Sequence, residues 1–292
     1  MTVTAPITAS WNGQIMPLDD VRVPALDRGF LFGDALYEVL RVKNGRPIFW
    51  EEHGERLESG LDAVQMTVDM PEIERQMHKL CASSVNKTGM IYLHITRGVG
   101  PRKHAFAIDA KPNVLIFIQP LDAEDIRRKQ QNGVSVILQP DLRWKRPDIK
   151  SSNLLPNCLA VTESVRAQAS EAILVSERGQ LTEGACSNLF LVIEDQIVTP
   201  PLEQRILGGV TRLKLIEIAR RQGYDVIERT IDQMEIFTAD EVFLTSTSID
   251  VMPVVKIHEQ LVNGGHPGNV TKSLGKLFAV MMESATATSK AA

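Results

Sequence analysis

Lys150 is the residue of this chain whose surroundings are best suited to chemistry. It lies in RPDIKSSNLL, among turn-forming and small polar residues that come just before an apolar helical pattern. An amine that acts as a nucleophile must be partly removed from water, and a strand-to-helix junction can hold it in such a place. Most lysines at such junctions are solvated surface residues, so the prediction needs support from other stretches.

Glu183 provides the first support. It lies in LTEGACSN, in an expected turn before the strand pattern LFLV, where Gly184, Ala185 and Ser187 leave little bulk around it. A carboxylate placed in this way can face a bound ring. In pyridoxal phosphate chemistry such a carboxylate keeps the pyridine nitrogen protonated, so that the ring accepts electrons from the substrate. The commoner alternative is a turn glutamate in water.

The stretch LGGVTR, residues 207–212, predicts a phosphate site. Two glycines precede the expected start of a helix, where backbone N–H groups and the helix dipole attract anions and Thr211 adds a hydroxyl donor. The stretch lacks the lysine of a P-loop and the spacing of a dinucleotide fingerprint, so a nucleotide cofactor is not expected. Further phosphate donors are expected from a hydroxyl run and an early helix: Thr245, Ser246, Thr247 and Arg56.

A basic loop, TRGVGPRKH at residues 96–104, is the third unusual stretch. Two glycines and a proline indicate a loop, and strand patterns at 90–98 and 113–120 flank it, the second apolar enough to be buried on both faces. Its basic side chains are Arg97, Arg102, Lys103 and His104.

Alternating strand and helix patterns run through the rest of the chain and predict an α/β (α+β) fold. In the first third they predict a turn at 11–13, a strand at 37–42, a hairpin turn at 44–45 and helices at 51–64 and 71–84. Later they predict helices at 154–169, 210–222 and 270–283, and strands at 134–139, 172–175, 188–193, 196–199, 225–230 and 241–246. A charged segment at 121–133 separates the two patterns, so we expect two domains, 1–120 and 121–292.

The composition favours a small-molecule role. The chain has 292 residues, 43% of them hydrophobic, and a net charge of -4, which gives no electrostatic footprint for nucleic acid or an anionic membrane. No leader or membrane-spanning pattern occurs, and a cytoplasmic location is expected. The three cysteines rule out complete disulfide pairing and match no zinc spacing, so no metal is expected.

Together, these stretches resemble the class IV aminotransferases. The resemblance covers nearly the whole chain in order and spacing, through DRGFLFGDALYEV (27–39), RPDIKSSNLL (146–155), LTEGACSN (181–188), GGVTR (208–212) and VFLTSTS (242–248). It implies a two-domain enzyme of fold type IV, with a smaller N-terminal α/β domain, a larger C-terminal pseudo-barrel domain and pyridoxal 5'-phosphate between them.

The resemblance also implies roles for single residues. Lys150 matches the lysine that forms the internal aldimine and moves the proton between the substrate Cα and the cofactor. Glu183 matches the partner of the pyridine nitrogen, and Leu207 matches the residue packed against the ring. The other expected cofactor-binding residues, most of them around the phosphate, are Arg56, Ser187, Val210, Thr211, Ser246 and Thr247.

Within the family the chain is most similar to the D-amino-acid enzymes. Tyr37, Arg102 and His104 match the group that holds the substrate α-carboxylate there, and we call these three residues the carboxylate site. In that branch the loop with the arginine and histidine comes from the neighbouring subunit, which implies a homodimer. Because Lys150 reaches only one face of the planar intermediate, the side on which the carboxylate is held decides which enantiomer reacts.

The resemblance therefore predicts a transaminase that moves the amino group of a D-amino acid, such as D-alanine, to a 2-oxo acid such as 2-oxoglutarate, through a pyridoxamine half-reaction. Alternatives within the fold are a branched-chain L-amino-acid transaminase, an (R)-amine transaminase and an aminodeoxychorismate lyase. A non-catalytic pyridoxal phosphate carrier is the alternative from another class. It would not need the complete carboxylate site.

Overall fold

The computed structural model describes residues 7–106, 109–204 and 206–287, and these divide into two compact units. The first unit holds the chain up to Leu121, together with Ile149–Asn153 and the end of the last helix. The second holds Asp122–Asp148 and Leu154–Ser284. The expected domain division at residue 120 stays a prediction, but residues 149–153, which that division assigns to the second part, group with the first unit.

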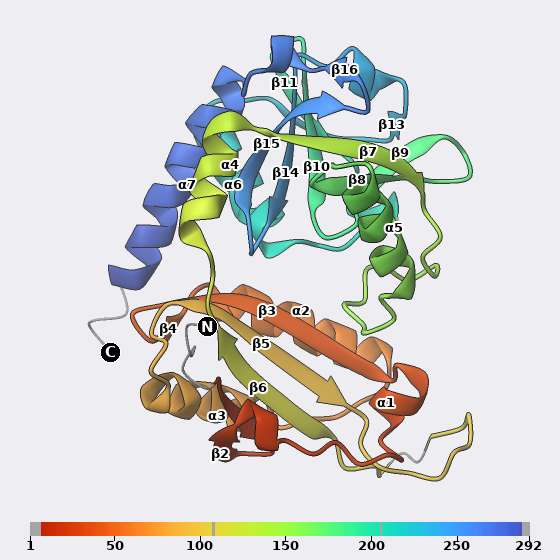
Figure 1. Ribbon diagram of the computed structural model, residues 1–292, viewed down its shortest axis with the longest axis vertical. Helices are drawn as coiled ribbons and strands as arrows, with labels where there is room; N and C mark the ends of the chain where they lie inside the picture. The colour runs from red at the N-terminus through yellow and green to blue at the C-terminus, as the bar shows by residue number, and fades with distance from the viewer. Residues whose placement is uncertain (1–6, 107–108, 205, 288–292) are drawn as a thin grey trace. The chain divides into compact units, whose positions relative to one another are not determined.

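A six-stranded antiparallel sheet forms the centre of the first unit (Figure 1). Its strand order is β2-β1-β6-β5-β3-β4. The strands are β1 (Thr8–Trp11), β2 (Gln14–Pro17), β3 (Ala35–Lys43), β4 (Arg46–Pro47), β5 (Gly89–Thr96) and β6 (Asn113–Gln119), and the helices are α1 (Arg28–Phe32), α2 (Trp50–Ala63) and α3 (Met70–Ser83).

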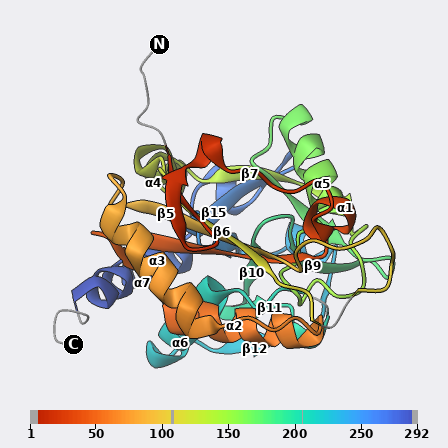
Figure 2. The same ribbon diagram turned by 90° about the horizontal axis from the view of Figure 1, so that it is seen from below.

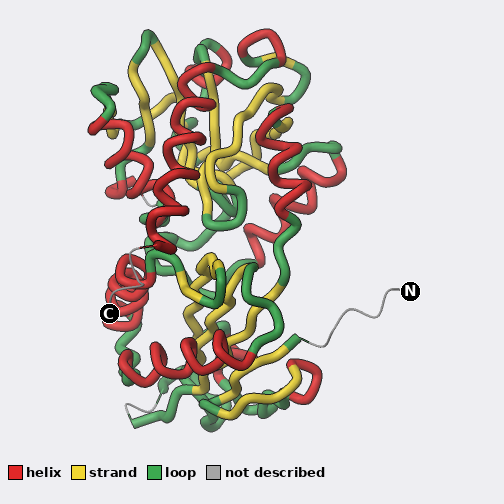
Figure 3. The backbone as a smooth tube through the Cα atoms, turned by 90° about the vertical axis from the view of Figure 1, so that its left-hand side faces the viewer, coloured by secondary structure: helices red, strands yellow, loops and turns green. Residues whose placement is uncertain are grey.

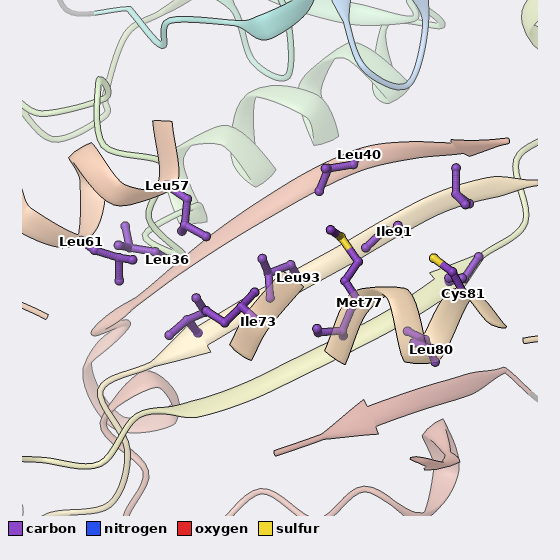
Figure 4. Close-up of a cluster of buried hydrophobic side chains, with 14 of the residues drawn as sticks. Leu36, Leu40, Leu57, Leu61, Ile73, Met77, Leu80, Cys81, Ile91 and Leu93 are labelled. Carbon is purple, nitrogen blue, oxygen red and sulfur yellow. The ribbon is translucent and has the colours of Figure 1, made fainter. Parts of the chain in front are cut away.

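Helices α2 and α3 cover the same face of this sheet, α2 against β3 and α3 against β1 and β6 (Figure 2). Alternate strand residues point to that face, so Leu40 of β3 and Leu93 of β5 meet Leu57 of α2 and Met77 of α3 in a buried cluster (Figure 4). Strand β6 follows the same alternation. The prediction that it is buried on both faces is wrong, because Ile116 and Ile118 are buried while their neighbours are only half-buried.

The second unit is built on a ten-stranded mixed sheet of order β12-β11-β10-β14-β15-β7-β8-β9-β13, with β16 paired to β15. Its strands are β7 (Val134–Pro140), β8 (Glu171–Val175), β9 (Gln180–Gly184), β10 (Asn188–Ile193), β11 (Gln196–Thr199), β12 (Val226–Glu228), β13 (Ile231–Asp232), β14 (Glu241–Ser246), β15 (Asp250–Ile257) and β16 (Gln260–Leu261). Its helices are α4 (Ala123–Asn132), α5 (Leu155–Arg166), α6 (Val210–Arg221) and most of α7 (Asn269–Ala287).

Both units combine helices with strands, which confirms the predicted α/β (α+β) class (Figure 3). The charged segment at 121–133 contains a helix, α4, that the sequence patterns did not predict; the Asp122 carboxylate caps it by accepting from the backbone N–H of Asp125. No helix in the described part of the chain is long and apolar enough to cross a membrane. Those same residues also contain no cluster of three or more His, Cys, Asp or Glu side chains that suits a metal ion.

Candidate functional site

Lys150 lies against strand β3, which contains Tyr37. The Tyr37 N–H donates to the Lys150 carbonyl at 3.0 Å, and the Ser152 N–H donates to the Ala35 carbonyl at 3.0 Å. Residues 150–152 therefore pair alongside the first residues of β3. The Lys150 Nζ lies 4.4 Å from the centre of the Tyr37 ring, within the range of a cation–π contact. The structure thus brings the predicted amine and one member of the carboxylate site together.

Arg56 is held by a buried carboxylate that the sequence analysis did not identify. Its Nε and Nη2 donate to the two oxygens of Glu38 at 2.8 and 2.6 Å, and Glu38 also bonds the His53 Nδ1 at 2.8 Å. Burial alone would raise the pKa of Glu38, but Arg56 and His53 hold it well below its usual range. Burial lowers the pKa of His53, and the positive charge of Lys150 lowers it further. The two hydrogen bonds from Arg56 to the Glu38 carboxylate fix the orientation of the Arg56 guanidinium.

Glu183 lies in a strand, not in a turn as predicted. It belongs to β9 and is 4% exposed, and one nearby donor and two from distant segments surround its carboxylate. Asn188 Nδ2 donates to Oε2 at 2.9 Å, the Leu207 N–H is 3.2 Å from both oxygens, and Arg143 Nη1 donates to Oε1. The structure therefore brings together two predicted cofactor-binding residues, Glu183 and Leu207.

One guanidinium is shared between Glu183 and Asp141. Arg143 donates its Nε and Nη2 to Asp141 at 2.9 and 2.8 Å and turns Nη1 to Glu183. The three side chains carry one net negative charge when both carboxyls are ionised, and burying such a charge is costly. Burial accordingly raises the pKa of Glu183 to about 7, although Arg143 opposes the shift. A cationic group beside Glu183, such as a protonated pyridine nitrogen, would compensate that charge, so the site fits the expected cofactor.

The raised pKa of Glu183 predicts a pH dependence of stability for the cofactor-free chain. Between its usual value of 4.5 and about 7, the folded chain binds more protons than the unfolded chain, so the free energy of unfolding falls as the pH rises through this window. We expect the loss to be on the order of 3 kcal/mol and complete above pH 7. Denaturant titrations of native and Glu183→Gln proteins from pH 4 to 8 measure it. A native curve that stays parallel to the variant curve would contradict the prediction.

The expected phosphate site lies at the first turn of α6, which begins at Val210 after Gly209. The first N–H groups of a helix have no partner within it, and Thr211 in this first turn is buried. Cross-strand pairing places Thr245 of β14 beside Asn188, and the Thr245 hydroxyl is buried without a hydrogen-bond partner. Buried hydroxyls are normally satisfied, so this orphaned donor fits a bound phosphate or water.

Gly209 connects the phosphate site to Glu183. A Cβ at this position would lie 2.0 Å from Oδ1 of Asn188, the residue whose amide donates to Glu183 and, at 2.8 Å, to the Leu207 carbonyl. The backbone of Gly209 has a φ of −66°, so space and not conformation demands glycine. At the neighbouring Gly208 a Cβ would meet only Leu202 at 3.8 Å, an ordinary contact.

We therefore expect Gly209→Ala to weaken pyridoxal phosphate binding by roughly tenfold or more, since it displaces a buried hydrogen-bonded amide. Gly275→Ala, in α7, is the control and should bind the cofactor like the native chain, because a Cβ there would meet only Val251 at 3.9 Å. Absorbance titration of the cofactor-free proteins measures both affinities. Equal losses in the two variants would mean that the contact with Asn188 is unimportant.

Three other residues are expected to bind the cofactor: Ser187, Ser246 and Thr247. The Ser187 hydroxyl donates to the buried Glu171 carboxylate at 2.8 Å, which ties it to the protein interior. The Ser246 hydroxyl lies 3.0 Å from that of Ser248 at the end of β14. Thr247 follows at the same strand end and is half-buried. Their roles toward a phosphate stay predictions.

The basic loop separates its charged side chains into two classes. Arg102 and His104 are exposed and both approach Phe32 of α1, at 5.9 and 5.8 Å from the ring centre. Arg97 is only 4% exposed and binds Asp34 at 2.8 Å, so its role is structural. The structure thus places Arg102 and His104 together, and their joint role with Tyr37 stays a prediction.

Sequence reasoning missed Arg143, Asn188 and Glu38, each of which orients a predicted residue. Two signals were available. Asn188 is the last residue of LTEGACSN, and Glu38 directly follows Tyr37 in β3. Arg143 gave no signal, because its partner Glu183 is 40 positions away along the chain.

The sequence matches a known protein family over most of its length. The model of the class IV amino-transferase family matches residues 35–257. A D-alanine aminotransferase of Bacillus licheniformis is 37% identical over 269 residues, covering 90% of this chain and 93% of that protein.

Solved structures show the same fold. The branched-chain amino acid aminotransferase of Thermobaculum terrenum, in its PLP-form, has a TM-score of 0.82 at 23% identity, covering 96% of this chain and 95% of that one. The 4-amino-4-deoxychorismate lyase of Pseudomonas aeruginosa has a TM-score of 0.83 at 28% identity, covering 93% and 98%. The match to the family model over residues 35–257 and the identity to a curated relative establish that this chain belongs to the class IV aminotransferases.

Proposed function

We propose that this chain is a D-amino-acid transaminase that uses pyridoxal 5'-phosphate to move the amino group of D-alanine, or a similar D-amino acid, to a 2-oxo acid such as 2-oxoglutarate. The observation that carries the proposal is the pair Arg102 and His104, held together on one exposed loop. A guanidinium offers two parallel hydrogen bonds to a carboxylate, and an imidazole can add a third. The similarity to D-alanine aminotransferases supports the same proposal.

The residues of each unit have distinct proposed tasks. Pyridoxal phosphate, when bound, supplies the electron sink that makes a proton at the substrate Cα removable. Lys150 provides the amine that holds the cofactor and then moves that proton as a general acid and base. Glu183 keeps a proton on the ring nitrogen, and the first turn of α6, with Thr211, holds the phosphate. Leu207 packs against the ring.

We further propose that the carboxylate site is completed in a homodimer, with Arg102 and His104 of one subunit serving the Tyr37 of the other. Their exposure is compatible with a task outside their own subunit. Sedimentation velocity should find a dimer, and mixing Arg102→Ala with Lys150→Ala subunits should restore part of the activity by forming one intact site per mixed dimer. The cytoplasmic location stays a prediction.

The structural relatives include a branched-chain aminotransferase and an aminodeoxychorismate lyase, and these remain the rival activities. The cofactor absorbance separates them, because an accepted amino donor converts the aldehyde form of the cofactor to the amine form. We expect D-alanine to bleach the aldehyde absorbance and L-leucine to leave it unchanged. Bleaching by L-leucine alone would rule out the D-selective proposal.

Replacing Arg102 tests the carboxylate site directly. Arg102→Ala should lower kcat/KM for D-alanine by roughly 10- to 150-fold, the effect of losing charged hydrogen bonds, with cofactor binding kept. Lys103→Ala removes an equal charge from the next exposed position and should retain native activity. If Arg102→Ala also keeps native activity, the loop does not bind the carboxylate.

A further inference from the structure

Arg28, a buried residue of α1, connects to the backbone of the basic loop. Its Nη1 donates to the Lys103 carbonyl at 2.7 Å and its Nη2 to the His104 carbonyl at 3.1 Å. Only 5% of the residue is exposed. A single planar guanidinium thus binds two consecutive peptide groups, the ones on either side of the His104 Cα.

The first part of the loop is also tied to the segment that begins α1. The Arg28 N–H donates to the Gly98 carbonyl at 2.9 Å, and the Gly100 N–H donates to the Leu26 carbonyl at 3.2 Å. Gly98 has a φ of +91°, and a Cβ there would lie 1.8 Å from the Lys111 carbonyl, so the two ends of the loop meet closely. Further along the loop, the Arg28 side chain binds the Lys103 and His104 carbonyls.

Asp34 fixes the direction of the Arg28 side chain. Its Oδ2 accepts from Arg28 Nε at 2.8 Å and from Arg97 Nε at 2.8 Å. The two arginines differ in what the rest of each guanidinium binds. Arg97 donates to the carbonyls of Val64 and Gln65, at the end of α2, at 2.7 and 2.9 Å. Arg28 alone of the two donates to the Lys103 and His104 carbonyls.

We propose that Arg28 is the positioning residue of the loop that carries Arg102 and His104. Its two bonds fix the peptide groups on either side of the His104 Cα, and so they fix the direction in which the His104 side chain leaves the backbone and the path of the segment that carries Arg102. The Asp34 carboxylate holds the Arg28 guanidinium in this direction, and the planar guanidinium keeps a fixed angle between its donating nitrogens. The consequence for substrate binding rests on the proposed function of Arg102 and His104, whereas the positioning of the loop does not.

Trypsin provides a readout of loop position that is independent of activity, because the loop itself contains the cleavable residues Arg102 and Lys103. An anchored loop resists cleavage, and a released loop is cut quickly. The cofactor-loaded native protein, Arg28→Met and Arg28→Lys are compared, with fragment masses identifying the cut. Arg28→Lys keeps the positive charge but replaces the guanidinium by a single ammonium group. This group cannot donate to Asp34 and to both carbonyls in the same directions. Arg28→Lys also serves if Arg28→Met fails to fold.

Arg97→Met is the matched control. It breaks the other ion pair of Asp34 and removes a side chain that is equally buried, while a methionine can still pack against the Phe106 ring, whose centre lies 3.7 Å from the Arg97 guanidinium carbon. We expect severalfold faster cutting at 102 or 103 in the Arg28 variants and little change in Arg97→Met. Unchanged cutting in the Arg28 variants, or equal acceleration in Arg97→Met, overturns the proposal.

Kinetics then separate this proposal from the proposed function. We expect KM for D-alanine to rise by roughly tenfold or more in Arg28→Met, with kcat and cofactor absorbance nearly unchanged, since the loss falls on substrate binding. Faster loop cutting with an unchanged KM supports the positioning role and counts against Arg102 and His104 as the carboxylate-binding residues. A lower kcat with native loop cutting and native KM counts against the positioning role.

Discussion

Lys150→Ala should abolish transamination while the chain still folds. The side chain supplies both the amine that holds the cofactor and the base that moves the substrate proton, and proton transfer alone contributes roughly 10²–10⁴-fold to a rate. Lys150 is half-buried over the Tyr37 ring, so its truncation removes one cation–π contact and leaves the backbone pairing with β3 intact. Steady-state turnover of D-alanine with 2-oxoglutarate measures the loss.

Two further measurements make this result specific. Lys145→Ala, at an exposed position of the same segment, is the control and should retain native turnover. Small primary amines added to Lys150→Ala should restore part of the rate, because they can enter the space left by the side chain and act as the base. Borohydride reduction of the native holoenzyme should fix the cofactor mass on the peptide that contains Lys150; its appearance on another lysine would assign the reaction elsewhere.

Glu183→Gln should lower kcat by roughly 10²–10³-fold, the usual effect of losing one preorganised electrostatic group in a buried site. The amide keeps the size of the carboxylate and can still accept from Asn188 and Leu207, but it cannot hold a proton on a ring nitrogen. Arg143 neutralises only one of the two carboxylates, Asp141 and Glu183, so the substitution also removes one uncompensated buried negative charge. The cofactor-free variant should therefore be more stable than the native chain above pH 7.

The opposite signs of these two effects identify a functional residue. A merely structural glutamate would lose stability together with activity when replaced. Glu177→Gln, in the exposed turn between β8 and β9, is the control and should change neither quantity. Native kcat in Glu183→Gln would mean that the carboxylate does not act on the cofactor.

Local signals were sufficient for much of the fold. The Asn44-Gly45 pair predicted a hairpin turn, and both residues have the positive φ that such a turn requires, 54° and 74°. The amphipathic patterns of α2 and α3 were equally direct. Strand β15 gave no such signal because it contains Pro253, which suits few central strands. Its pairing with β7 begins only at Val254, so the proline removes no donor from that ladder.

The sequence suggested candidate members of the site but not the residues that orient them. Lys150, Glu183 and the glycines before α6 lie in short motifs, and the order of these motifs along the chain, with the family resemblance, pointed to them. The burial of Glu183 could not be read from its polar neighbours, because Arg143 and Leu207, which enclose it, are far away in sequence. Arg28 illustrates the same limit, since the carbonyls that it binds lie 75 and 76 positions further along the chain.

The close contact between Gly98 and Lys111 has a consequence for how this enzyme can change over evolution. Strands β5 and β6 keep an unbroken register up to the pair Thr96 and Asn113. The loop begins and ends just beyond this pair, where Gly98 and Lys111 approach each other closely. Insertions or replacements between these two ends therefore leave the register of the sheet untouched. We expect that transplanting the corresponding segment of another class IV enzyme between these two ends alters substrate preference and leaves the sheet intact.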